Sequence, residues 1–426
     1  MNTIVNSRID EKVLYEKLDS GLKIFFMPKP GFSKKYAVFS TNYGSIDNNF
    51  IPIGEEENLV VPEGIAHFLE HKLFEEEDEA LFEKFSRLGA SVNAFTNFNQ
   101  TSYLFSTTDN FYESLELLVK FVQSPYLTDE NVEKEKGIIS QEIKMYDDDP
   151  GWRVFFNCLR SMYVNHPIRI DIAGTVESIN TITKELLYKA YNTFYNPSNM
   201  VLFIIGDLSF EKIIDVVKSS EKKFEKKEEN IKRIYTDEPK EINEKFIEEK
   251  MVTSTPLFYI GFKDSDLNLM GKDAVKKDLI TNIILDLLFS PSSLFYNELY
   301  NEGLITSNFG AYFTGKRTYG HSLVIGESHK PKIVYEKVLN LIDKRGEEVL
   351  KLEDFNRIKN KNLGNFLMGL NSIEFIANNF VDLYFDDFII LDYLDVMEEI
   401  QYNDILKRFK NHFTRGNVVL SIINPI

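Results

Sequence analysis

The chain has 426 residues, of which 43% are hydrophobic and 27% charged, and its formal net charge is −17. This composition is ordinary for a folded protein of roughly two to four domains, and it excludes collagen-like, low-complexity and disordered chains. The acidic excess also argues against a nucleic-acid-binding protein, because such a protein needs a basic face.

The cysteine content and the apolar runs bear on the compartment. A single cysteine, Cys158, excludes an intrachain disulfide and a cysteine-rich zinc site, and it is typical of a reducing environment. The N-terminus has no basic start followed by an apolar run, so we expect no secretory signal. Apolar stretches such as Met200–Ile205 are too short to cross a bilayer, so we expect no membrane span and a cytoplasmic protein.

In the first half, β-branched and aromatic runs bounded by Gly, Asn or Asp predict strands. Apolar residues spaced three and four apart predict the helices that alternate with them. The predicted strands are 13–29, 35–48, 90–96, 100–107 and 200–205, and the predicted helices are 62–74, 78–88, 110–124, 129–147 and 183–194. Residues 218–243 are rich in Lys and Glu, which predicts a solvated linker or an exposed helix.

The second half repeats this arrangement. Its predicted elements are strands at 256–262, 307–313, 322–325 and 417–423, with helices at 272–288 and 291–301 and three further helical stretches. The two halves also close alike, since an Asn-x-Phe triplet precedes both the strand at Met200 and the strand at Asn417. We therefore predict a duplicated α+β unit, with one domain over 1–217 and a related domain over 244–426.

One segment, His67-Phe-Leu-Glu70-His71, has the residue types and spacing of a catalytic metal site. On a helix, His67 and His71 lie one turn apart on the same face and can bind one metal ion. Pro62 suits the first helical position and Glu63 the positive end of the helix dipole. Two imidazoles and a carboxylate favour zinc with one open position. Glu70 is then placed to activate a zinc-bound water as general base and to return the proton to the leaving amine.

The competing interpretation is a surface helix with two solvated histidines. Flanking apolar residues such as Ile65, Phe68 and Leu69 argue against it, because they predict a largely buried helix. A third metal ligand must come from elsewhere, and the helix predicted over 129–147 offers several carboxylates. By spacing alone the candidates are Glu130, Glu133, Glu135 and Glu142. Apolar neighbours give Glu142 a modest preference, although a solvated helix charge explains any one of the four.

The motif His67-x-x-Glu70-His71, followed by Glu135-Lys-Gly-Ile-Ile-Ser-Gln-Glu142, resembles the inverted-zincin metallopeptidases of family M16. This family includes pitrilysin, insulin-degrading enzyme and the mitochondrial processing peptidase. The two segments are most similar to a bacterial subgroup called YmfH-like, often encoded beside a second M16-like protein. The resemblance implies one zinc ion per chain, with Glu142 as the third ligand and Glu135 as a carboxylate that steadies a histidine.

The segment 89–96 resembles the edge strand at the active site of this family. There the backbone around Asn93, Ala94 and Phe95 would pair with an extended substrate. The resemblance implies an α+β fold of two homologous domains, each a mainly antiparallel sheet covered by helices (a LuxS/MPP-like metallohydrolase fold), forming a clamshell around the substrate. It further implies a zinc-dependent endopeptidase of extended, unfolded peptides, working as a homodimer or as a heterodimer with a second M16-like protein.

One departure from the family pattern concerns the second half. Active members usually carry an Arg and a Tyr seven residues apart, which bind the substrate carbonyl. Tyr300 and Thr306 stand at the corresponding places, with one residue fewer between them. The candidates for the missing donor are Arg317, Tyr319 and a partner subunit. Arg317 and Tyr319 are equally well explained as plain surface residues without a role at the site. The alternative function is a peptide-binding or partner-scaffolding subunit with little activity alone.

Overall fold

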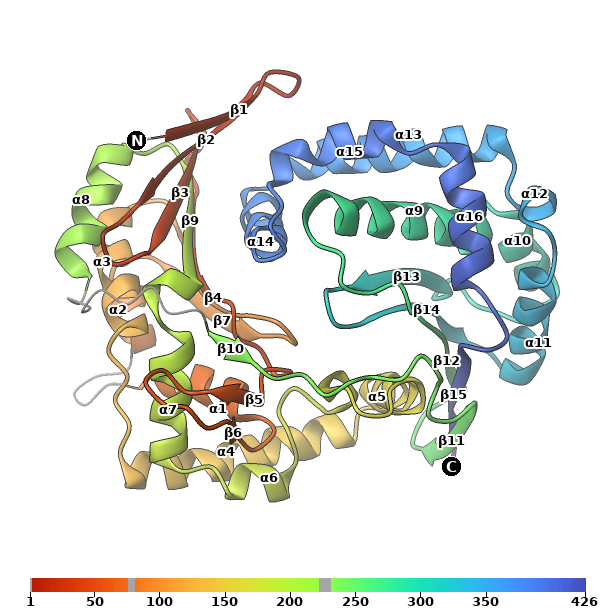
Figure 1. The fold of residues 1–426 in the computed structure, drawn as a ribbon, viewed down its shortest axis with the longest axis horizontal. Coiled ribbons are helices and arrows are strands. Elements are labelled where there is room, and N and C mark those ends of the chain that lie inside the picture. The colour runs from red at the N-terminus through yellow and green to blue at the C-terminus, as the bar shows by residue number, and fades with distance from the viewer. Residues whose placement is uncertain (1, 76–80, 222–230) are drawn as a thin grey trace.

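Two β-sheets with helical layers organise the computed structural model, which describes residues 2–75, 81–221 and 231–426 (Figure 1). The first sheet has the strand order β1 (Asn2–Asn6), β2 (Glu11–Lys17), β3 (Lys23–Pro28), β9 (Met200–Gly206), β4 (Lys35–Thr41), β8 (Thr101–Thr107) and β7 (Ser91–Thr96). The second sheet has the order β11 (Phe246–Met251), β15 (Val418–Pro425), β12 (Leu257–Lys263), β14 (Gly320–Glu327) and β13 (Gly310–Gly315). A small third sheet joins β10 (Lys232–Arg233), β5 (Asn49–Ile51) and β6 (Leu59–Val60).

The two large sheets share one topology. In the first, β3 and β9 are parallel, and β4, β8 and β7 follow in antiparallel pairs. In the second, β11 and β15 are parallel, and β12, β14 and β13 follow in antiparallel pairs. The five strands also occur in the same chain order, so the predicted repetition of an α+β unit agrees with the structure, and the predicted fold class is confirmed.

Sixteen α-helices occur among the residues that the structure describes. Those of the first half are α1 (Ile65–Leu73), α2 (Leu81–Arg87), α3 (Phe111–Val122), α4 (Asp129–Asp147), α5 (Pro150–Met162), α6 (Val176–Asn180), α7 (Lys184–Phe194) and α8 (Phe210–Ser220). Those of the second half are α9 (Gly271–Phe289), α10 (Leu294–Asn301), α11 (Pro331–Ile342), α12 (Gly346–Val349), α13 (Leu352–Gly369), α14 (Ile373–Tyr384), α15 (Tyr393–Glu399) and α16 (Tyr402–His412). Six helices thus replace the three stretches predicted after β14, and α5, α6 and α8 were not predicted.

Each half lends one helix to the sheet of the other half (Figure 1). Helix α5 packs on β12 and β15, where a Cβ atom on Gly261 would lie 2.7 Å from Met162 Sδ and 2.8 Å from Cys158 Sγ. Helix α14 packs on β4 and β9, and the Phe380 ring lies 4.3 Å from the Phe203 ring. Because these exchanged helices bury one face of each sheet, the two halves share their cores.

The segment between the halves is extended over its described residues, 231–243, and most of them are exposed, which fits the predicted solvated linker rather than a helix. Two side chains anchor it. Arg233 Nε lies 2.9 Å from Asp47 Oδ1, and Glu238 pairs with Lys263 of the second sheet. The predicted linker begins inside α8, since that helix ends at Ser220, and residues 222–230 lie outside the described part.

The expectation that no segment could span a membrane overlooked Gly271–Asn301. This stretch, which covers α9 and α10, is long and apolar enough by length and composition alone. However, 67% of the 18-residue apolar stretch within this segment is buried inside the protein, where α9 packs against the second sheet and α16. The apolar length of this segment is therefore explained by its place in the second core.

Candidate metal centre

The helix that carries the histidine motif begins later than the sequence predicts. Pro62 is not the first helical residue, because α1 starts at Ile65 after Gly64, which has a φ of 86°. A Cβ atom on Gly64 would lie 2.2 Å from Ala173 O, so only glycine fits here. Ser178 Oγ also donates to Glu63 O at 2.9 Å. The start of α1 is therefore fixed by a segment distant in sequence, which includes Ala173 and the first turn of α6.

His67, His71 and Glu142 converge from α1 and α4, as predicted for a metal site. One potential ligand atom from each residue lies within 4.8 Å of the others, and this is the one such group found among the described residues. Glu142 Oε1 is 3.6 Å from His67 Nε2, and Glu142 Oε2 is 3.5 Å from His71 Nε2. These separations are too long for hydrogen bonds. They are close to the ~3.3 Å between donors around a tetrahedral zinc ion, so the donor set fits zinc.

Glu135 holds the second histidine from the side opposite Glu142. Its Oε1 lies 3.0 Å from His71 Nδ1, which leaves His71 Nε2 free to face Glu142. Burial favours a neutral His71 ring, but the hydrogen bond to Glu135 and the negative charges of Glu70, Glu135 and Glu142 together outweigh burial and raise the pKa of His71. Burial also opposes ionisation of Glu135, yet the same bond and the charges of His71, Lys72 and Lys134 together lower the pKa of that carboxyl. Glu135 thus stands where a carboxylate steadies a metal-binding imidazole.

His67 has a different environment. Its Nδ1 is buried and has no hydrogen-bond partner among the described residues. Burial, assisted by the nearby His71, lowers the pKa of His67 to about 3. The ring is therefore neutral near pH 7, and neutral imidazole is the form that binds a metal ion.

Glu70 lies beside the candidate metal-binding group without belonging to it. It is buried, and the Thr96 hydroxyl donates to its Oε2 at 2.7 Å. Burial raises the pKa of Glu70, and the Thr96 hydrogen bond offsets only part of that effect. A carboxylate with a raised pKa next to a metal site is suited to proton transfer.

Strand β7, which carries the predicted substrate-binding residues, lies at the edge of the first sheet. It pairs with β8 on one side, and no strand of the described chain pairs with its other side. Asn93 is exposed at this edge, while Ala94 and Phe95 are partly buried. Since Thr96 ends the same strand, the edge and Glu70 are joined directly.

Helix α10, which carries Tyr300, lies away from this site. Tyr300 lies half-exposed at the end of α10 and Thr306 is exposed beyond it, and Figure 1 shows α10 and α1 on opposite sides of the molecule. Arg317 is exposed in the β13–β14 turn. Tyr319 is buried, and its hydroxyl donates to Asn99 Oδ1, in the turn between β7 and β8, at 2.6 Å.

Two contacts at the site were not predicted. Thr96 binds Glu70, as described above, and Tyr146 Oη donates to Glu142 Oε1 at 2.9 Å. The second contact had a signal in the sequence, because Tyr146 follows Glu142 by one helical turn. The contact between Thr96 and Glu70 had no signal in the sequence, since β7 and α1 meet only in the folded chain.

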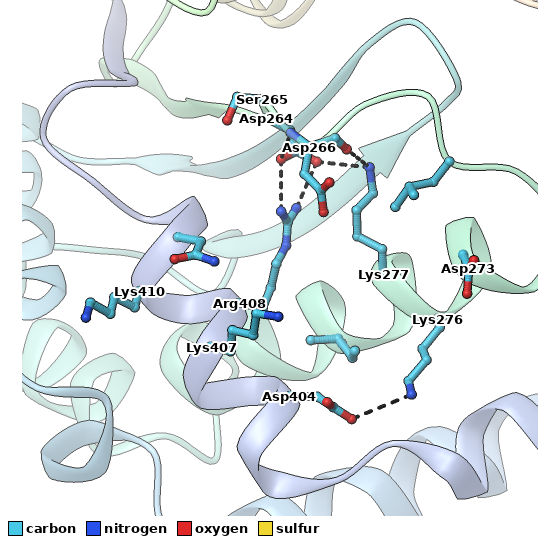
Figure 2. A pocket seen from close by; sticks show the side chains of 13 residues that line it. Asp264, Ser265, Asp266, Asp273, Lys276, Lys277, Asp404, Lys407, Arg408 and Lys410 are labelled. Atoms are coloured by element: carbon cyan, nitrogen blue, oxygen red, sulfur yellow. Dashed lines mark hydrogen bonds and ion pairs between the residues drawn. The ribbon is translucent and has the colours of Figure 1, made fainter.

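A cavity of about 940 Å³ in the second half lies apart from these residues, between α9 and α16. Figure 2 shows its buried floor, where both terminal nitrogens of Arg408 lie 2.9 Å from the two oxygens of Asp264. Lys277 Nζ lies 3.1 Å from the same carboxylate. Arg408 and Lys277 thus share one buried carboxylate, so we interpret the floor as a structural ion-pair cluster.

Comparison with known proteins gives family models and relatives over nearly the whole chain. A model described as Insulinase (Peptidase family M16) matches residues 51–176, and one described as Peptidase M16 inactive domain matches residues 181–362. An uncharacterized zinc protease of Bacillus subtilis, YmfH, is 45% identical over 98% of both chains. The zinc protease PqqE of Helicobacter pylori is 22% identical, over 88% of this chain and 86% of that protein.

Solved structures agree with the fold described above. The crystal structure of an M16-like peptidase from Alicyclobacillus acidocaldarius has a TM-score of 0.94 at 38% identity, covering 98% of this chain and 99% of that one. A protease from Helicobacter pylori has a TM-score of 0.83 at 19% identity, covering 97% and 100%. The second likeness concerns the fold alone.

Proposed function

The chain belongs to peptidase family M16, and from this premise we propose that it is a zinc-dependent endopeptidase of extended, unfolded peptides. The observation that carries the proposal is the convergence of His67, His71 and Glu142 beside the buried Glu70. The relatives named zinc proteases support zinc as the metal.

His67 Nε2, His71 Nε2 and the Glu142 carboxylate would hold the ion. When bound, zinc polarises a carbonyl oxygen and lowers the pKa of water toward about 7. Glu70 takes the proton of the attacking water and later gives it to the leaving amine nitrogen. Thr96 holds Oε2 of Glu70, so Oε1 is the oxygen available to carry that proton.

The substrate adds to the first sheet as a further strand. The outer side of β7, around Asn93, Ala94 and Phe95, offers backbone groups to an extended peptide. A folded protein presents little extended backbone with free hydrogen-bonding groups, because most of its backbone groups are already paired. The proposed substrate is therefore an unfolded peptide, and its bond to be cleaved lies near the Thr96 end of β7.

A second candidate function is a peptide-binding or scaffolding subunit with little activity alone. It is favoured by Tyr300 and Thr306, which stand where active members have Arg and Tyr, and which lie away from the metal-binding residues. A homodimer, or a heterodimer with a second M16-like protein, would reconcile the two functions if the partner supplied the missing donor. Loss of one such donor costs ~10²–10³ in rate.

The test measures zinc content and cleavage of an internally quenched peptide by the full chain, alone and with a co-purified partner. We expect one zinc per chain and cleavage by the wild type. Glu70→Gln should keep the zinc and lower the rate by ~10²–10⁴-fold, because it cannot accept the proton. Glu133→Gln is the matched control, since Glu133 is an exposed carboxylate of α4.

Two results would contradict the proposal. Stoichiometric zinc without cleavage, alone or with the partner, would favour the binding subunit. Undiminished cleavage by Glu70→Gln would show that another group is the base.

A further inference from the structure

Glu142 is oriented by a side chain of its own helix. Tyr146 lies one turn further along α4, and its hydroxyl donates to Glu142 Oε1 at 2.9 Å. This bond occupies one carboxylate oxygen and fixes the plane of the group. The other oxygen, Oε2, is then directed toward His71 Nε2, 3.5 Å away.

Tyr146 is in turn held by Trp152, in the first turn of α5. The two rings stack, with centroids 4.7 Å apart and an angle of 19° between their planes. The indole N–H of Trp152 donates to Asp171 Oδ2, and Asp171 Oδ1 accepts from the Ala173 N–H at 2.9 Å. The Trp152 ring therefore cannot turn without losing a hydrogen bond to a partly buried carboxylate.

The same loop supports the helix that carries the histidines. Gly64, at the start of α1, lies against Ala173 O, and Ser178 Oγ donates to Glu63 O. The segment 171–178, a loop that leads into the first turn of α6, thus contacts α1 on one side and Trp152 on the other. Ligands from both α1 and α4 are consequently positioned against one common support.

Helix α5 links this support to the second half of the chain. Val154 O accepts a hydrogen bond from Ser421 Oγ of β15 at 2.9 Å. The Trp152 ring also lies 5.2 Å from the ring of Phe156, which belongs to the core between α5 and the second sheet. The place of Trp152 beside Tyr146 therefore depends on how α5 lies on that sheet.

We propose that Tyr146 and Trp152 are positioning residues that orient Glu142 for metal binding and make metal affinity depend on the packing of α5 against the second sheet. The proposal rests on the metal site of the proposed function, but it does not require peptidase activity. The simpler explanation is that Trp152 only packs and that the Tyr146 hydrogen bond is incidental, in which case neither affects metal affinity.

The test measures the zinc dissociation constant of the full chain by competition with a chromophoric chelator. Tyr146→Phe removes only the hydroxyl and keeps the stacked ring, and we expect zinc to bind ~10–100-fold more weakly. Trp152→Phe removes the indole N–H, and we expect a loss in the same direction. Tyr112→Phe is the matched control, because it removes a tyrosine hydroxyl that binds the Ser209 N–H far from the site. The control should bind zinc like the wild type.

A second measurement separates positioning from general damage to the fold. Cobalt(II) in place of zinc gives visible absorption bands that report the geometry of the ligands. We expect Tyr146→Phe to change these bands, while the melting temperature of the metal-free variant stays that of the metal-free wild type.

Zinc affinity and cobalt bands that are unchanged in Tyr146→Phe would overturn the proposal, as would a wild type that binds no zinc. A wild type that binds zinc without cleaving peptides would leave the positioning roles standing and count only against the peptidase.

Discussion

At the residue scale, the spacing of two glutamates on α4 explains how one histidine is held from both sides. Glu135 and Glu142 are seven residues apart, which is ~10.5 Å along a helix and brings both to the same face. Glu135 therefore reaches His71 Nδ1, while Glu142 faces His71 Nε2. The sequence alone left four glutamates as candidates, because spacing along α4 does not show which face of that helix meets α1.

Replacement of Glu135 by Gln tests this arrangement. We expect Glu135→Gln to weaken zinc binding by ~10–100-fold, because the neutral amide no longer fixes and polarises the His71 ring as a carboxylate does. The measurement is the zinc dissociation constant, with Glu133→Gln as a control on the same helix. Equal affinities of Glu135→Gln and wild type would mean that the Glu135–His71 contact does not support the metal.

At the element scale, the start of α1 shows what a local pattern cannot predict. Pro62 and Glu63 have the residue types of a helix N-terminus, yet α1 begins at Ile65. The reason is the contact between Gly64 and Ala173 O, which are more than a hundred residues apart in sequence. Helix α4, whose start is set by its own Thr128 and Asn131 in a capping box, was predicted with the correct bounds.

Alanine substitutions at two glycines, one at the start of α1 and one inside α4, test this difference. Gly64→Ala should destabilise the protein by ~1–3 kcal/mol and weaken zinc binding. An alanine residue is strained at the φ of 86° found here, and its Cβ atom would lie 2.2 Å from Ala173 O. Gly137→Ala should stabilise it by ~0.5–1 kcal/mol, because Gly137 is helical and nothing lies within 4 Å of its added Cβ.

Urea unfolding of the two variants measures both effects. A Gly64→Ala variant as stable as Gly137→Ala would show that the start of α1 is not held as the structure describes.

At the scale of the whole molecule, the repeated unit could be predicted and the exchange of helices could not. The closing strands at Met200 and Asn417 look alike in sequence, and they occupy equivalent positions in the two sheets. Helix α5 has an apolar face that indicates burial, but its sequence does not say which sheet it covers. It starts at Pro150, directly after the acidic run Asp147–Asp149.

The exchange has a consequence for the site. Because α5 follows α4 directly and packs on the second sheet, the metal-binding half is tied to the rest of the chain close to Glu142. The core around Phe380, on α14, ties the halves together at the other sheet. The two histidines of the candidate site could be predicted from the sequence because they lie one turn apart on one helix, and Glu142 followed from the family resemblance. The residues that support them are spread over both halves, which no local pattern indicates.

The most direct test of the account is anomalous X-ray diffraction at the zinc absorption edge, from crystals of the purified full-length chain. We expect one strong peak per chain, at ~2.0–2.2 Å from ligand atoms of His67, His71 and Glu142. A zinc-loaded protein whose peak lies elsewhere, or that shows no peak between α1 and α4, would contradict it.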